Sequence, residues 1–175
     1  MSCSIRCLII GVLMMFPTFA YATTTRLAER EARLDATFKS IGAYFHIPHQ
    51  LLKAIARQES GCQPLVLNIK GRDYYPRTKE EAILLCAVAE RLGVQYDVGL
   101  MQINRYWIHK YNLPHALLFN AEDNLYTACF ILSQEINRVG FGWKAVGYYH
   151  SKTKWRAKEY AKKVRGHLLN ILGNR

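Results

Sequence analysis

Beyond its first 22 residues, the 175-residue sequence contains no apolar run long enough to span a bilayer. It also lacks metal-ligand spacing, a glycine-rich nucleotide loop, internal repeats and low-complexity segments. We therefore expect a protein without a metal or cofactor, and without a stable membrane anchor once the N-terminal segment is removed.

Acidic residues are also scarce, because 13 Asp and Glu oppose 24 Lys and Arg, for a formal net charge of +11 at pH 7. Such an excess favours polyanionic partners, namely nucleic acid, an anionic membrane surface or an acidic cell-wall polymer. Much of the excess lies between Lys152 and Arg175, so it is in part a property of the C-terminal segment.

The first residues have the features of a secretory signal peptide. Arg6 supplies a positive charge, residues 7–16 form a short apolar run, and residues 20–22 (AYA) fit a small-x-small cleavage site. We predict a signal peptide over residues 1–22, export to the periplasm, and one mature domain over residues 23–175. Export argues against nucleic acid as a partner. An uncleaved membrane anchor is the less favoured alternative, because the apolar run is short.

Export also places the chain where disulfides can form. The mature segment retains Cys62, Cys86 and Cys129, an odd number, so at most one internal bridge is possible and three pairings are open. Alternatively, all three are small buried thiols.

Apolar residues recur at helical spacing through nearly all of the mature segment. We predict helices over about 27–45, 48–60, 78–92, 121–139, 143–150 and 160–171, and a short one within 98–113. Thr78 and Glu81 form a capping box for the third of them. The weak strand signal is confined to residues 65–98. The fold class expected is mainly α: a single compact domain of short helices with at most a small β-hairpin region.

The stretch LLKAIARQES, residues 51–60, combines an apolar helical stripe with one acid. Glu59 lies in the last turn, where the helix macrodipole disfavours an anion, close to Ile55 and Ala56. An apolar pocket raises a carboxyl pKa, as a general acid near neutral pH requires. Glu59 is thus a candidate acid, although a solvated surface Glu is the commoner explanation of this stretch alone.

Two further segments carry groups that suit a carbohydrate site. GLMQIN, residues 99–104, alternates apolar residues with the amides of Gln102 and Asn104, and AVGYYHS, residues 145–151, places two phenols beside His150. Trp107 and Trp143 are candidate sugar-stacking platforms. Each feature also fits an ordinary core helix or a structural side chain.

Four motifs occur in one order: IPHQLLKAIARQES, DVGLMQIN, AEDNL and AVGYYHS. Together they resemble the catalytic domain of soluble lytic transglycosylases, over about residues 45–164. The similarity is greatest to the small single-domain type associated with type IV secretion, type IV pili and related envelope-spanning machines. It implies a lysozyme-like fold.

The resemblance also implies roles for individual residues. Glu59 corresponds to the catalytic acid, and Ser60 to a serine that helps to hold the substrate and the Glu. Gln102 and Asn104 correspond to polar groups lining the glycan groove, with Met101 on its wall.

Other positions follow from the remaining motifs. Tyr149 corresponds to an aromatic residue that contacts the catalytic Glu. His150 stands where many members have Asn, and its role is left open. Gly99 and Asn124 are expected to act structurally within their motifs.

The implied reaction cleaves the β-1,4 bond between N-acetylmuramic acid and N-acetylglucosamine in peptidoglycan. No water is added, because the muramic C6 hydroxyl closes onto C1 to give a 1,6-anhydro end. Glycosidases commonly need two carboxylates, but one suffices where the N-acetyl group of the substrate assists. The three motifs that line the groove offer only Glu59, and Asp97, just before GLMQIN, is the one nearby candidate for a second acid.

The segment 70–96 departs from the family pattern, because many members have a short loop there. Three interpretations of its Arg72, Tyr74 and Tyr75 are open. They extend the sugar groove, they contact a partner, or they belong to an ordinary surface loop, and the last is slightly favoured.

Two other functions compete with the transglycosylase. One is a lysozyme-type muramidase in which Asp97 or another acid positions a water. The other is a peptidoglycan-binding assembly protein of an envelope machine, recruited through its basic C-terminal segment.

Overall fold

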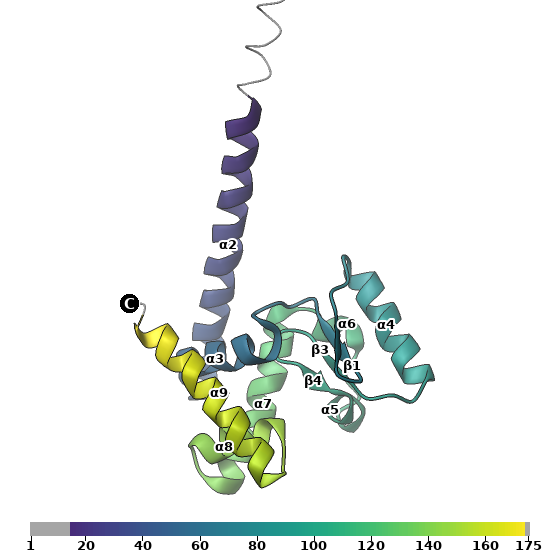
Figure 1. The fold of residues 1–175 in the computed structure, drawn as a ribbon, viewed down its shortest axis with the longest axis vertical. Helices are drawn as coiled ribbons and strands as arrows, with labels where there is room; N and C mark the ends of the chain where they lie inside the picture. The colour runs from purple at the N-terminus through teal and green to yellow at the C-terminus, as the bar shows by residue number, and fades with distance from the viewer. Residues whose placement is uncertain (1–14, 174–175) are drawn as a thin grey trace, which may run out of the picture. The chain divides into compact units, whose positions relative to one another are not determined.

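The computed structural model describes the backbone of residues 15–173 and the side chains of residues 25–173 (Figure 1). The chain divides into two compact units, residues 1–37 and 38–175, and the features below belong to the second. Helix α2 (Met15–Tyr44) begins earlier than predicted. Most of the predicted signal peptide lies outside the described residues, so this segment stays a prediction. Among the described residues, no helix has the length and apolarity needed to cross a bilayer.

The second unit is mainly helical, as the sequence predicts. After α2 come α3 (His49–Ser60), α4 (Lys79–Arg91), α5 (Arg105–Lys110), α6 (His115–Leu118), α7 (Ala121–Val139), α8 (Trp143–His150) and α9 (Lys154–Gly173). The one-turn helix α6 lies where a plain connector was expected. Helix α9 packs against α3 and α8, and α7 packs against α8.

A small antiparallel sheet completes the fold. Its strands are β1 (Leu67–Ile69), β2 (Arg72–Tyr74), β3 (Tyr96–Val98) and β4 (Ile103–Asn104), in the order β2-β1-β3-β4. Lys70 (φ 52°) and Gly71 (φ 81°) close the β1–β2 hairpin with two left-handed residues, which suits the twist of the strands. The predicted strand region contains three strands but misses β4, because two residues are too few to show an alternating pattern. The mainly α prediction with a small β region is confirmed.

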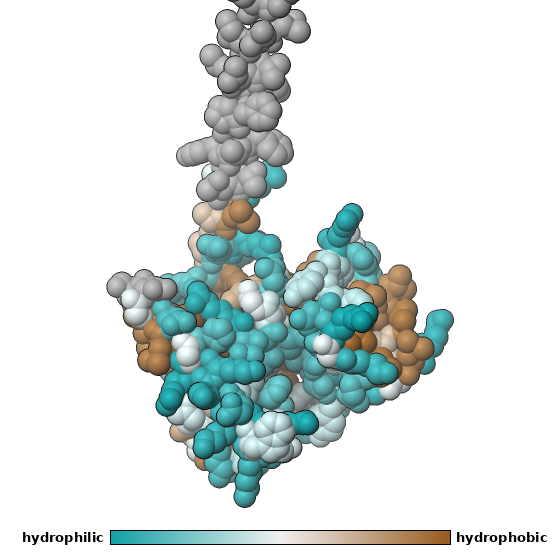
Figure 2. Space-filling view, viewed as in Figure 1, coloured by the Kyte–Doolittle hydropathy of each residue, from teal (hydrophilic) through white to brown (hydrophobic). Residues whose placement is uncertain are grey.

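Helix α4 fills much of the 70–96 segment. The Thr78 hydroxyl accepts the N–H of Glu81, while the Glu81 carboxylate accepts the N–H of Arg77 rather than that of Thr78, a variant of the predicted capping box. Its outer face exposes Leu84, Val88 and Leu92, the hydrophobic surface over α4 in Figure 2.

Gly147 lets α8 and α9 approach closely, because a Cβ there would meet the Ala157 carbonyl oxygen at 2.5 Å. No disulfide joins the three cysteines of the described residues: Cys86 and Cys129 are buried, and Cys62 is half-buried. Burial raises the pKa of both buried thiols to about 12, which keeps them protonated and unreactive.

Candidate active site

Glu59 lies at the C-terminal end of α3, beside a groove of about 710 Å³. The apolar stripe of α3 is buried, and Gly61 (φ 61°) ends the helix in the left-handed conformation. The groove is lined by Glu59, Asn68, Asp73, Asp97, Gln102, Ile103, Asn104, Tyr106, Trp107, Ile131, Tyr148, Tyr149, His150, Ser151 and Lys152. Helix α3, the sheet, and the region from α7 to α8 therefore all contribute to one site.

The surroundings of Glu59 favour its protonated form. Desolvation by burial raises its pKa, a hydrogen bond from Tyr160 lowers it, and the charge of Asp97 raises it again, to about 8 in all. No cation figures among the groups that set this pKa. At pH 7 most of the Glu59 side chains therefore carry a proton, as a general acid must.

Tyr160 on α9 was not predicted as a site residue, yet it makes the direct contact with Glu59. Its hydroxyl donates to Glu59 Oε1 at 2.5 Å, which leaves Oε2 as the oxygen that can carry the proton. The imidazole of His150 stacks on the Tyr160 ring, with centroids 4.6 Å apart and planes 4° apart. The sequence shows Tyr160 only as part of the apolar stripe of the last helix. The sequence feature that could have pointed to Tyr160 is its hydroxyl, which needs a hydrogen-bond partner when it is buried.

Tyr149 was expected to contact Glu59, but its hydroxyl donates to the Met101 carbonyl oxygen at 2.8 Å. Burial and then the charge of Glu59 raise the pKa of Tyr149 well above its ordinary value, so the two groups remain electrostatic neighbours. In this structure, Tyr149 fixes the GLMQIN turn, while Tyr160 takes the hydrogen-bonding role expected of Tyr149.

The GLMQIN turn is held from several sides. Gly99 (φ 77°) has no room for a side chain, because a Cβ would meet Asn124 Nδ2 and the Leu118 carbonyl oxygen at 2.4 Å. The buried Asn124 accepts the Met101 N–H at 2.8 Å and donates to the carbonyl oxygens of Val98 and Leu118. Asn124 and Gly99 thus fix the backbone between β3 and β4.

Ser60 and Met101 are not among the residues that line the groove. The Ser60 hydroxyl donates to the Leu100 carbonyl oxygen at 2.7 Å, and the Met101 side chain is buried. Ser60 therefore joins the end of α3 to the GLMQIN turn, while Met101 packs beneath the turn. Gln102, by contrast, lines the groove with φ 49° and donates through Nε2 to the Gly99 carbonyl oxygen at 2.9 Å.

Asp97 and Asn104 form a pair on the adjoining strands β3 and β4. Asn104 Nδ2 donates to Asp97 Oδ1 at 2.8 Å, and Asn104 Oδ1 accepts the N–H of Tyr106, which caps α5. Burial raises the pKa of Asp97, and the hydrogen bond from Asn104 opposes this rise. Asp97 is therefore a second carboxylate in the groove, held in place by an amide.

The 70–96 segment reaches the groove through a residue that was not predicted. Asp73 lines it together with Asn68, whose Nδ2 donates to Asp73 Oδ1 at 2.6 Å. Arg72, Tyr74 and Tyr75 do not contribute to the lining. Sequence spacing could not reveal this, because strand pairing decides which hairpin residues face the groove. Of the two candidate tryptophans, Trp107 lines this groove and Trp143 lines a neighbouring one.

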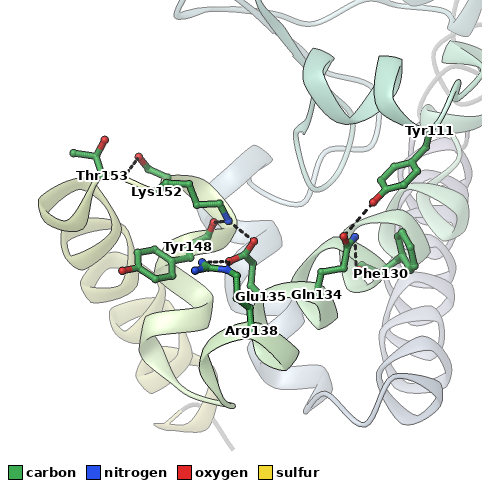
Figure 3. A network of polar contacts seen from close by, with 9 residues as sticks. Tyr111, Phe130, Gln134, Glu135, Arg138, Tyr148, Lys152 and Thr153 are labelled. Carbon is green, nitrogen blue, oxygen red and sulfur yellow. Dashed lines mark hydrogen bonds and ion pairs between the residues drawn. The ribbon is translucent and has the colours of Figure 1, made fainter.

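Glu135 is a further enclosed carboxylate, joined to the groove residue Lys152 (Figure 3). Glu135 on α7 accepts hydrogen bonds from Lys152 and from Arg138, the latter at 2.5 Å. Burial alone would raise the pKa of Glu135, but these hydrogen bonds and charges outweigh it and lower the pKa. The Arg138 guanidinium also lies 4.8 Å from the centroid of the Tyr148 ring.

Comparison with known proteins places this arrangement in a family. A model of the Transglycosylase SLT domain matches residues 36–168. Invasion protein IagB of Salmonella typhi is 29% identical over 128 residues, which cover 69% of this chain and 67% of that protein. The type IV secretion system protein virB1 of Brucella abortus is 30% identical over 92 residues, which cover 51% of this chain but only 39% of that protein.

A mainly helical domain with a small sheet and a glutamic acid beside a groove is consistent with a lysozyme-like class of protein. Because the family match spans most of the chain, the protein belongs to the transglycosylase SLT domain family.

Proposed function

We propose that the protein is an exported peptidoglycan lytic transglycosylase with Glu59 as its catalytic acid and base. The observation that carries this proposal is the environment of Glu59, a carboxyl group beside a 710 Å³ groove with a pKa of about 8. The bond to be cleaved is the β-1,4 link between N-acetylmuramic acid and N-acetylglucosamine.

In the proposed reaction, the proton on Glu59 passes to the glycosidic oxygen as the bond from this oxygen to C1 breaks. The N-acetyl oxygen of the muramic acid stabilises the positive charge at C1. The Glu59 carboxylate then accepts the proton of the C6 hydroxyl, whose oxygen bonds to C1 and gives the 1,6-anhydro end. The proton count is balanced and Glu59 returns to its starting state.

Other groove residues have supporting roles in this proposal. The amides of Gln102 and Asn104 supply hydrogen-bond donors and acceptors for sugar hydroxyl and N-acetyl groups. Trp107, stacked on Tyr111 with ring planes 6° apart, offers an aromatic surface for a sugar ring. Tyr149 and His150 also line the groove, and Ser60 and Met101 act through the turn beneath the substrate.

We further propose that the enzyme works in the periplasm and opens the wall locally for an envelope-spanning machine. The virB1 relative is a type IV secretion system protein, which supports a secretion apparatus as partner, and a pilus apparatus is the related alternative. The signal peptide over residues 1–22 is part of this proposal.

A muramidase is the second candidate, because Asp97 and Asp73 line the same groove as Glu59 and a carboxylate there can activate a water. A peptidoglycan-binding assembly protein is the third, supported only by the basic C-terminal segment.

Digestion of purified sacculi by residues 23–175, followed by mass spectrometry, separates these functions. The transglycosylase gives 1,6-anhydro ends, whereas reducing ends with one added water would support the muramidase. Retained binding to sacculi without fragments would support the assembly protein.

A further inference from the structure

A second groove, separate from the Glu59 site, runs between α8 and α9. It has a volume of about 570 Å³, and its lining includes Trp143, Tyr148 and Ala161. Figure 2 shows a largely hydrophilic surface over these two helices. We refer to it as the α8–α9 groove.

The charge of the α8–α9 groove is strongly one-sided. Its lining contains the cations Lys144, Lys154, Lys158, Lys162 and Arg165, and a single acid, Glu159. In the described part of the chain, none of these five cations forms an ion pair with a carboxylate. This differs from Lys152, which Glu135 neutralises.

The α8–α9 groove adjoins the candidate active site. Tyr148 lines both cavities, so the two grooves adjoin at this residue. Alternating apolar and cationic surface along α9 suits an extended chain that carries carboxylates among short apolar side chains.

We infer that the α8–α9 groove binds the acidic stem peptide of the peptidoglycan strand while the glycan occupies the groove beside Glu59. This inference rests on the proposed function. The stem peptide hangs from the muramic acid at the cleavage point and bears free carboxylates, which matches both the location and the charge of the groove. The protein would therefore favour strands that carry peptides over bare glycan.

The test compares peptide-bearing glycan strands with strands from which an amidase has removed the peptides. The variant Lys158→Glu/Lys162→Glu reverses two groove charges, and Lys79→Glu/Arg91→Glu on the exposed surface of α4 makes the same change of net charge elsewhere. We expect the groove variant to lose about tenfold in kcat/KM on peptide-bearing strands and to stay within about twofold of wild type on bare strands. The α4 control should match wild type on both substrates.

Equal losses on both substrates, or no loss on either, would overturn the inference. A binding measurement tests the inference without any need for catalysis. Wild type is titrated calorimetrically with an isolated stem tetrapeptide and, separately, with the fully amidated form of this peptide. Preference for the free carboxylates, abolished in the groove variant alone, supports the inference even if no strand is cleaved, in which case only the proposed function fails. Binding of phosphatidylglycerol vesicles through the same lysines, without discrimination between the two peptides, would instead identify an anionic surface as the ligand and overturn it.

Discussion

Two glutamates in this domain show how neighbours decide what a partly enclosed carboxyl group does. Glu59 receives one hydrogen bond from a neutral phenol and feels the negative charge of Asp97, and its pKa rises to about 8. Glu135 is less exposed to solvent than the half-buried Glu59, but Lys152 and Arg138 contact it and its pKa falls. The first site holds a proton at neutral pH and the second holds a charge. Glu59 thus suits acid catalysis and Glu135 suits attachment of α7 to the end of α8.

The largest effect is expected from Glu59→Gln. The amide keeps the size of the side chain and can accept the hydrogen bond from Tyr160, but it cannot donate a proton to the leaving oxygen. We expect cleavage of sacculi to fall by about 10³-fold, while glycan binding and the circular dichroism spectrum are retained. Activity within about tenfold of wild type would show that Glu59 has been misassigned. The matched Glu135→Gln variant should keep most of its activity.

Glu135→Gln should instead lower stability. Removal of its charge breaks two ion pairs, but Lys152 and Arg138 are 59% and 50% exposed and can be solvated by water. We therefore expect a loss of about 1–2 kcal/mol at pH 7, below the usual cost of a stranded buried charge.

The pH dependence of stability tests whether the loss in Glu135→Gln comes from the removed charge. A lowered carboxyl pKa adds stability at pH values above the unfolded pKa, and this stability disappears as the pH falls through the folded pKa. The difference between wild type and Glu135→Gln in urea unfolding should therefore shrink below about pH 4. A difference that stays constant down to that pH would indicate lost packing rather than lost charge.

Glu59→Gln should have the opposite effect on stability. A raised carboxyl pKa means that wild type loses stability as pH rises from the unfolded value of 4.5 toward the folded value of about 8. At about pH 8.5 we expect Glu59→Gln to be more stable than wild type by on the order of 1–2 kcal/mol, because water in the open groove screens part of the effect. At about pH 4 the two proteins should unfold at nearly the same urea concentration. Equal stability at both pH values would mean that the carboxyl group of Glu59 is well solvated.

The contrast between these glutamates could be predicted only in part from the sequence. The helical periodicity of residues 48–60 and 143–150 reflects local packing, so those helices lie where predicted. Glu59 could be proposed because its motif is contiguous in the chain. Tyr160 lies 101 residues from Glu59, and its contact depends on the packing of α9 against α3, which no local pattern encodes. Asp73 was missed because its position depends on the β1–β2 hairpin.

Smaller effects, shifts in the pH profile of activity, are expected from variants of Tyr160 and Asp97, which change the pKa of Glu59 in opposite directions. If the protonated form of Glu59 is the active one, kcat/KM should decline above about pH 8. Tyr160→Phe removes a hydrogen bond that lowers this pKa, so the decline should move to higher pH. Asp97→Asn removes a charge that raises it, so the decline should move to lower pH, each by about half a unit.

This pair of variants is informative because the two expected shifts of the pH profile have opposite signs. A purely structural defect in either variant would reduce the maximum rate without moving the alkaline limb of the pH profile in a defined direction. A muramidase with Asp97 as its base predicts instead that Asp97→Asn loses nearly all activity at every pH. A profile of kcat/KM from about pH 5 to pH 9.5, with His150→Ala as a control that removes the ring stacked on Tyr160 but no hydrogen bond to Glu59, distinguishes these cases. Shifts of the same sign in both variants would contradict the electrostatic account of Glu59, because Tyr160 and Asp97 act on its charged form in opposite directions.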